Sequence, residues 1–197
     1  MPEPAILILA AGAASRMRGA DKLLEPVDGA PLLTRIARAA LATGLPVTVA
    51  LAPDRPARRT ALHGLAVIPV MVPDPGLGMA ASLVAGLGAM PPGPMMLLLA
   101  DLPEITAEDL IRMAEAHRAA PDLIHRGTAA DGTPGHPVIF PAWARAGLLS
   151  LTGDQGARAL IRQHADRLHL TALPGTHATT DLDTPEAWAE WRASRGE

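Results

Sequence analysis

Short apolar runs alternate with stretches of helical periodicity along most of the chain. The apolar runs predict strands, the first beginning at Ile6 and the others at residues 46–51, 66–72, 94–100, 137–140 and 168–173. Helical spacing predicts helices at residues 31–43, 55–63, 80–89, 157–164 and 184–195, and one more that Thr106 caps. Pro69 makes the strand at 66–72 irregular or an edge strand. The alternation predicts an α/β fold, with a Rossmann-like, doubly wound, mostly parallel sheet between two layers of helices.

Composition narrows the class of protein. The 197 residues are 49% hydrophobic and contain no repeat or polar linker, which predicts a single domain over residues 1–197. The net charge is −3, basic residues are scattered and aromatic residues are scarce, so we expect no nucleic-acid partner. The absence of cysteine excludes disulfides, thiolate catalysis and cysteine-bound metals. The longest apolar stretch is too short for a membrane span and no signal-peptide pattern begins the chain, so we expect a cytoplasmic protein.

The loop after the first strand is the first candidate site. Small residues follow Leu9, and two cations, Arg16 and Lys22, stand six positions apart. Small residues let backbone N–H groups approach a phosphate chain, and the cations neutralise it. The loop matches neither the Walker pattern nor the dinucleotide pattern, and a surface turn with two solvated cations stays open as an alternative.

Carboxylates at two further positions are candidate metal ligands. Asp101 directly follows the most apolar run, and ligands of parallel sheets bind at the carboxyl ends of strands. Mg²⁺ prefers one or two carboxylates together with substrate phosphates, so Asp101 is a candidate ligand. The alternative is that Asp101 only caps a helix or stabilises a turn. Asp183 becomes a second ligand if it faces Asp101. Either Asp183 or Thr184 could instead cap the last helix, and the choice between Asp181 and Asp183 stays open.

The histidines show no zinc-binding spacing. His136 lies in a constrained turn between Gly135 and Pro137, while we interpret His63, His117 and His164 as solvated residues on helices. No serine stands as an obvious nucleophile with histidine and aspartate partners.

Several motifs together resemble the molybdopterin nucleotidyltransferase family, and most closely its molybdenum cofactor cytidylyltransferases. They are Leu-Ala-Ala-Gly at 9–12, Ser-Arg-Met at 15–17, Lys22, and the segments 78–83, 99–103, 135–140, 153–158 and 181–186. The resemblance covers practically the whole chain. Ala11 favours the cytidylyl over the guanylyl branch. One departure is Arg18, which lengthens the first loop by one residue and offers a further phosphate contact.

The resemblance implies transfer of CMP from CTP to the terminal phosphate of a molybdopterin-type cofactor, with release of pyrophosphate. Arg16, Lys22 and Asp101 would be catalytic, and Asp101 with Asp183 would hold Mg²⁺. The nucleotide would contact Leu9, Ala10, Ala11, Gly12, Gly78, Met79 and Ser82. The acceptor would contact Gly135, His136, Pro137 and Asp154. A molybdoenzyme or its maturation chaperone is a further candidate partner.

Two alternatives remain from the sequence. One is a nucleotidyltransferase of the same fold that uses GTP or another phosphorylated acceptor. The other is a non-catalytic chaperone that binds the pterin cofactor, which would not need the metal carboxylates. The oligomeric state is left open.

Overall fold

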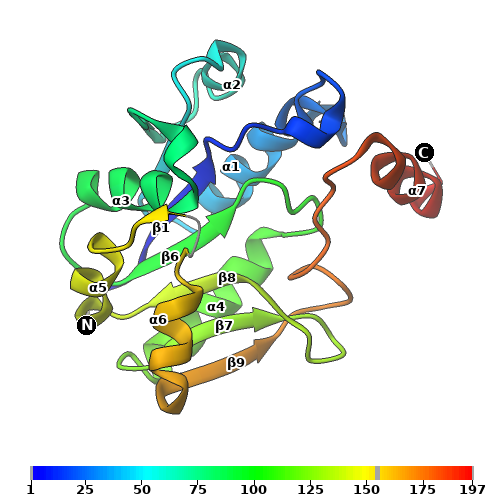
Figure 1. The fold of residues 1–197 in the computed structure, drawn as a ribbon. Coiled ribbons are helices and arrows are strands. Elements are labelled where there is room, and N and C mark those ends of the chain that lie inside the picture. Colours follow the sequence, from blue (N-terminus) through cyan, green and yellow to red (C-terminus); the bar gives the residue numbers. More distant parts are fainter. Residues whose placement is uncertain (1, 154–155, 197) are drawn as a thin grey trace.

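A seven-stranded sheet forms the centre of the molecule (Figure 1). The computed structural model describes residues 2–153 and 156–196. The strand order is β5-β4-β1-β6-β8-β7-β9, and β2 and β3 pair separately as a small hairpin. The strands are β1 (Ala5–Ala10), β2 (Pro26–Val27), β3 (Ala30–Pro31), β4 (Val47–Leu51), β5 (Ile68–Met71), β6 (Met95–Leu99), β7 (Ile124–Thr128), β8 (Pro134–Phe140) and β9 (Leu168–Ala172).

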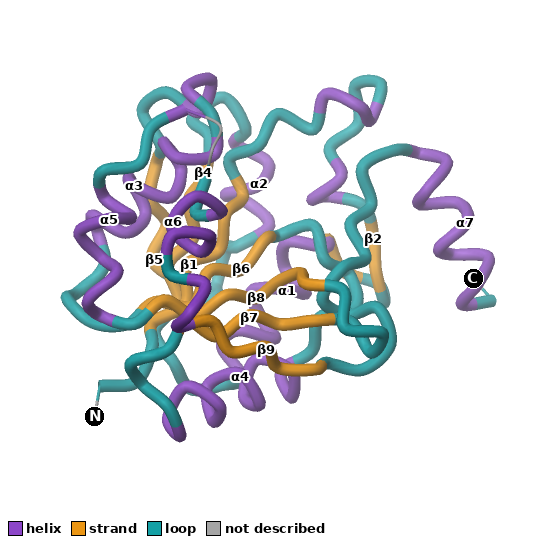
Figure 2. The backbone as a smooth tube through the Cα atoms, turned by 60° about the horizontal axis from the view of Figure 1, so that its bottom comes forward, coloured by secondary structure: helices purple, strands orange, loops and turns teal. Residues whose placement is uncertain are grey.

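Helices cover both faces of the sheet (Figure 2). They are α1 (Leu32–Ala42), α2 (Pro56–Ala61), α3 (Met79–Ala89), α4 (Ala107–Ala119), α5 (Arg145–Leu149), α6 (Arg158–Gln163) and α7 (Pro185–Arg195). Short 3₁₀ turns include η1 (Ser15–Met17), η2 (Lys22–Leu24), η3 (Pro75–Leu77), η4 (Ala142–Ala144) and η6 (Ala165–Arg167). Within the described ranges, no helix combines the length and apolar character that a membrane span requires.

Strand directions confirm the predicted fold class. β1 runs parallel to β4 and β6, β4 parallel to β5, and β7 parallel to β9, whereas β8 is antiparallel to both β6 and β7. β5, which contains Pro69, lies at an edge as expected. The sheet is therefore mostly parallel, with one reversed strand near its β9 edge.

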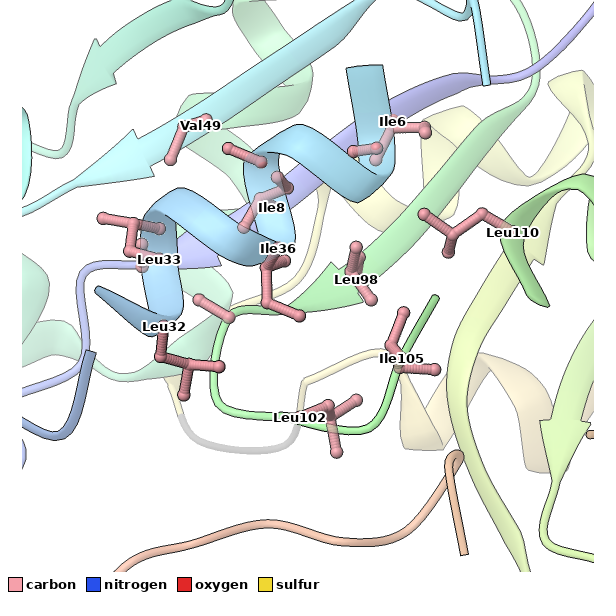
Figure 3. Packing of buried hydrophobic residues seen from close by; sticks show 14 of the residues in the cluster. Ile6, Ile8, Leu32, Leu33, Ile36, Val49, Leu98, Leu102, Ile105 and Leu110 are labelled. Atoms are coloured by element: carbon pink, nitrogen blue, oxygen red, sulfur yellow. The ribbon is translucent and has the colours of Figure 1, made fainter. Parts of the chain in front are cut away.

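The alternation of side chains along β1 divides the core into two layers. Ile6 and Ile8 belong to one buried cluster with residues of α1, α4 and α7, whereas Leu7 and Leu9 belong to a second cluster with residues of α3, α5 and α6. Figure 3 shows Ile36 of α1 beside Ile8 and Leu98, which come from neighbouring strands of the sheet. Because both faces are covered, β1 and β6 are continuous apolar runs, as central parallel strands require.

The prediction of a solvated His117 is wrong. Its side chain is buried in the helix α4, and its ring meets the His125 ring edge-on at a centroid distance of 5.7 Å. Leu110, Met113 and Ala114 are buried on the same helix, and His117 continues their i, i+3, i+4, i+7 spacing. The periodicity of the helix thus outweighs the polarity of the side chain.

Candidate active site

The carboxyl ends of β1 and β6 bring the two main candidate segments together. Leu9 pairs with Leu99 in the parallel register, and the backbone N–H of Ala100 donates to the Leu9 carbonyl at 3.3 Å. The loop at residues 11–22 leaves one strand where Asp101 follows the other. This is the sheet edge at which parallel α/β folds bind ligands.

A cleft of about 620 Å³ opens at this edge. The residues that line it include every position predicted for catalysis, the nucleotide or the metal: Leu9, Ala10, Ala11, Gly12, Arg16, Lys22, Gly78, Met79, Ser82, Asp101 and Asp183. The sequence separates these residues by up to about 170 positions, and the fold assembles them around one space. Their contacts with a substrate remain predictions.

Lys22 is the charged centre of the cleft. Its Nζ donates to Asp101 Oδ2 at 2.6 Å and also to Asp183 Oδ1, while Arg16 Nη1 donates to Asp183 Oδ2 at 2.7 Å. Burial disfavours the ammonium, but attraction to Asp101 and the hydrogen bonds to both carboxylates prevail, so the pKa of Lys22 is raised. The hydrogen bond from Lys22 lowers the pKa of Asp183, and the charge of Arg16 adds to this effect. Lys22 and Asp183 are therefore both charged at neutral pH.

The carboxylates fit a divalent cation. Asp101 and Asp183 already converge on one positive charge, the Lys22 ammonium. The second oxygen of Asp101, Oδ1, is buried and has no hydrogen-bond partner among the described residues. No group of three or more metal-ligating side chains exists in the described ranges. Two carboxylates without a full protein cage are the arrangement that Mg²⁺ adopts when substrate phosphates complete its shell.

The end of the cleft near α7 shows which of Asp183 and Thr184 caps the last helix. Thr184 caps α7, because its Oγ1 accepts from the Ala187 N–H at 3.2 Å. Asp183 is therefore free to face Lys22. Asp181 lines the cleft but makes no ion pair with Lys22 in the described part of the chain. The geometry favours Asp183 over Asp181 as the partner of Asp101.

Comparison with known proteins identifies the family. Residues 6–168 match the MobA-like NTP transferase domain. The chain belongs to this family. Membership makes the protein a nucleotidyltransferase, although it leaves the base and the acceptor undefined.

Solved structures show the same architecture. Rv0371c from Mycobacterium tuberculosis H37Rv superposes with a TM-score of 0.80 at 26% identity, over 96% of this chain and 98% of that chain. A complex of Rv0371c with manganese gives a TM-score of 0.81 at 25% identity, over 98% of this chain and 100% of that chain. The bifunctional protein GlmU of Rhodospirillum rubrum is 33% identical over 125 residues, which are 62% of this chain but only 28% of GlmU.

A buried arginine that the sequence did not single out holds the loop of this MobA-like domain. Arg58 of α2 donates through Nε and Nη2 to the Asp21 carboxylate at 2.7 and 2.9 Å. Its Nη1 donates to the carbonyls of Ala10 and Gly12 at 2.7 and 2.8 Å. Arg58 thus joins the start of the loop to the residue before Lys22. The one sequence signal is its helical spacing from buried Leu62, which is weak evidence.

Arg18 does not line the cleft. It adopts a left-handed backbone conformation with φ of 51° and donates to Glu186 Oε1 at 2.6 Å, with both side chains exposed. The structure therefore gives Arg18 an ion pair with α7 in place of the phosphate contact suggested by the sequence. Lys22 reaches Asp101 despite the extra residue.

A second cavity of about 460 Å³ adjoins the first cleft. Gly135 and His136 line it, as predicted for the acceptor, and Arg126 and Arg158 line it as well. Pro137 is buried within β8 and does not line this cavity, and its contact with the acceptor stays a prediction. Asp154, the remaining acceptor prediction, lies outside the described residues.

Gly135 explains how the second cavity is closed on one side. A Cβ at this position would lie 1.9 Å from the Ala178 carbonyl oxygen, so only glycine allows the two backbones to approach. The His136 N–H also donates to that carbonyl at 2.9 Å. Burial, together with the charges of Arg126 and Arg158, lowers the pKa of His136 to about 4, so its ring is neutral at pH 7.

Proposed function

We propose that this protein transfers CMP from CTP to the terminal phosphate of a molybdopterin-type cofactor and releases pyrophosphate, with Mg²⁺ held by Asp101 and Asp183. The observation that carries the proposal is the meeting of Lys22 with both carboxylates beside the loop at residues 11–22. Cations alone would bind a triphosphate, whereas a pair of carboxylates at the same point suits a metal-dependent transfer. The Leu-Ala-Ala-Gly start of the loop supports cytidine, and the resemblance to the cytidylyltransferases supports the acceptor.

In the proposed reaction an oxygen of the acceptor phosphate attacks the α-phosphorus of CTP. A new P–O bond forms, and the bond from the α-phosphorus to the oxygen that bridges to the β-phosphorus breaks. Pyrophosphate leaves with the electron pair of that bond. Such a transfer depends on positioning and charge neutralisation more than on acid–base chemistry, in keeping with a cleft rich in ion pairs.

Four charged residues and the small residues of the loop have roles in this proposal. Arg16 and Lys22 neutralise the triphosphate, and the small residues at 10–14 let it approach the backbone. Asp101 and Asp183 would hold the metal, which would supply positive charge to the phosphate oxygens. Lys22 holds both carboxylates in place before the substrate binds, and its ammonium lies where it can then turn to the phosphates.

The test is a panel of the four ribonucleoside triphosphates with Mg²⁺. Pyrophosphate release is followed with and without molybdopterin cofactor. The proposal predicts release that requires both CTP and the cofactor, with formation of a cytidylylated pterin. Preference for GTP would contradict the base assignment, and turnover with a different phosphorylated acceptor only would contradict the pterin.

The same panel tests the non-catalytic alternative. A chaperone would bind the pterin cofactor tightly and release no pyrophosphate from any triphosphate. That result would refute the enzymatic proposal, provided that the protein is folded and binds nucleotide or cofactor in the same preparation.

A further inference from the structure

The second cavity is lined by more positive than negative side chains. Arg126 of β7 and Arg158 of α6 both line it, and the only acidic side chain in its described lining is Asp181. Asp181 also lines the first cleft, at the boundary between the two spaces. The first cleft, by contrast, contains Asp101 and Asp183 opposite its cations. The interior of the second cavity is thus cationic.

Neither arginine of the second cavity has a carboxylate partner among the residues that the structure describes. Arg126 donates from Nε to the Gly135 carbonyl at 3.1 Å and from Nη2 to the Pro134 carbonyl at 3.3 Å, which fixes its direction without neutralising it. Arg158 is exposed and has no hydrogen bond or ion pair in the described ranges. Most other arginines described here do have acidic partners, as Arg58 has in Asp21.

The two guanidinium groups are close enough to affect one another. Burial lowers the pKa of Arg126, and the charge of Arg158 lowers it further. Two like charges beside one concave space repel each other, and an anion between them removes that repulsion. Paired guanidinium forks also match the oxygens of a phosphate group, to which they donate charge-assisted hydrogen bonds.

A third polar group points to a ligand in the same cavity. His136 Nδ1 is buried and has no hydrogen-bond partner among the described residues. Its ring is neutral at pH 7, so Nδ1 can make one hydrogen bond with an oxygen or a donor of a ligand. A buried polar atom without a partner is uncommon, and a bound molecule would satisfy it.

We propose that Arg126 and Arg158 form an anion site that holds a phosphate monoester of the acceptor. Arg158 lines both cavities, so a phosphate held there lies at the boundary with the triphosphate cleft. This inference rests on the proposed function, and it requires that the acceptor carry an anionic group. Arg126 lines the second cavity only, and its positive charge there favours an anionic acceptor.

The test measures binding of inorganic phosphate and phenyl phosphate to the full-length protein by calorimetry. Arg158→Gln and Arg126→Met each remove one guanidinium, and we expect each to weaken binding at least about tenfold. Arg162→Gln is the matched control, because Arg162 is exposed on α6 and lines neither cavity. It should bind both probes as the wild type does.

The loss in Arg126→Met locates the anion in the second cavity. If Arg126→Met does not fold, Arg158→Gln carries the test, and Arg126→Lys retains the charge and should retain most of the binding. Wild-type protein that binds neither probe, or equal affinity in wild type and Arg158→Gln, would overturn the inference. A loss in Arg162→Gln as large as in Arg158→Gln would overturn it too.

Turnover separates this inference from the proposed function. With CTP and molybdopterin cofactor, Arg158→Gln should raise the KM for the cofactor at least about tenfold, and Arg162→Gln should not change it. If the wild type releases no pyrophosphate, the proposed function fails. If the wild type turns over and Arg158→Gln has an unchanged KM for the cofactor, only the anion site fails.

Discussion

Removal of the buried guanidinium of Arg58 should destabilise the fold and displace the nucleotide loop. Its side chain is 0% exposed and makes hydrogen bonds with Asp21, Ala10 and Gly12. Arg58→Met keeps the aliphatic bulk but leaves the Asp21 carboxylate without its partner. Breaking a buried ion pair from one side costs about 3–5 kcal/mol. In a chain of this length that loss lowers Tm on the order of 10 °C.

Arg18→Met is the matched control. The Arg18 and Glu186 side chains are 74% and 57% exposed, and such surface pairs contribute about 0–1 kcal/mol. Urea unfolding followed by circular dichroism measures both variants against the wild type. Equal free energies of unfolding for Arg58→Met and Arg18→Met would refute the structural role given to Arg58.

The same substitution should lower activity at temperatures where the protein stays folded. Asp21 precedes Lys22, so a loop released from Arg58 no longer fixes the Lys22 ammonium at Asp101. A displacement of about 1 Å at a reacting group can cost on the order of 10²-fold in rate. Full kcat in folded Arg58→Met would show that Lys22 is positioned without this contact.

Other predictions concern packing, pH and the metal ligands. Gly135→Ala places a Cβ 1.9 Å from a backbone oxygen and should lower the free energy of unfolding in denaturant by about 3 kcal/mol or more. The control Gly88→Ala, at an exposed position of α3, should raise that free energy by about 0.5–1 kcal/mol. Because the pKa of His136 is about 4 in the folded protein and 6.5 for an unperturbed histidine, its contribution to stability is complete above pH 6.5 and is lost as pH falls toward 4. His136→Gln should therefore flatten the fall in unfolding free energy over that range. Asp183→Asn should lower kcat/KM about tenfold more than Asp181→Asn, since of these two it is Asp183 that contacts Lys22, and equal losses would contradict the metal assignment.

The sequence predicts the part of the site that follows from strand order. β1 and β6 are continuous apolar runs, and the rule that ligands bind at carboxyl ends of parallel strands places Asp101 beside the first loop. The apolar pattern does not predict that β8 lies antiparallel between β6 and β7. Its partner β7 interrupts the apolar pattern with His125, Arg126 and Gly127, so periodicity does not reveal a buried strand.

Residues whose role depends on distant partners escape sequence analysis. Arg58 lies in a polar helix, and its carboxylate partner is 37 positions away. Arg126 and Arg158 belong to different elements and meet only because the fold lines one cavity with both. His117 differs, because its burial follows from local helical spacing. The prediction that it is solvated gave the polarity of its side chain too much weight.

Pyrophosphate release from CTP by Asp101→Asn tests the central claim most directly. Asparagine keeps the shape of the side chain but removes the charge that would hold Mg²⁺ and that pairs with Lys22. With saturating Mg²⁺, CTP and molybdopterin cofactor, the rate should fall on the order of 10²-fold or more, while Asp166→Asn at the surface keeps the wild-type rate. A folded Asp101→Asn protein that releases pyrophosphate at the wild-type rate would contradict the account.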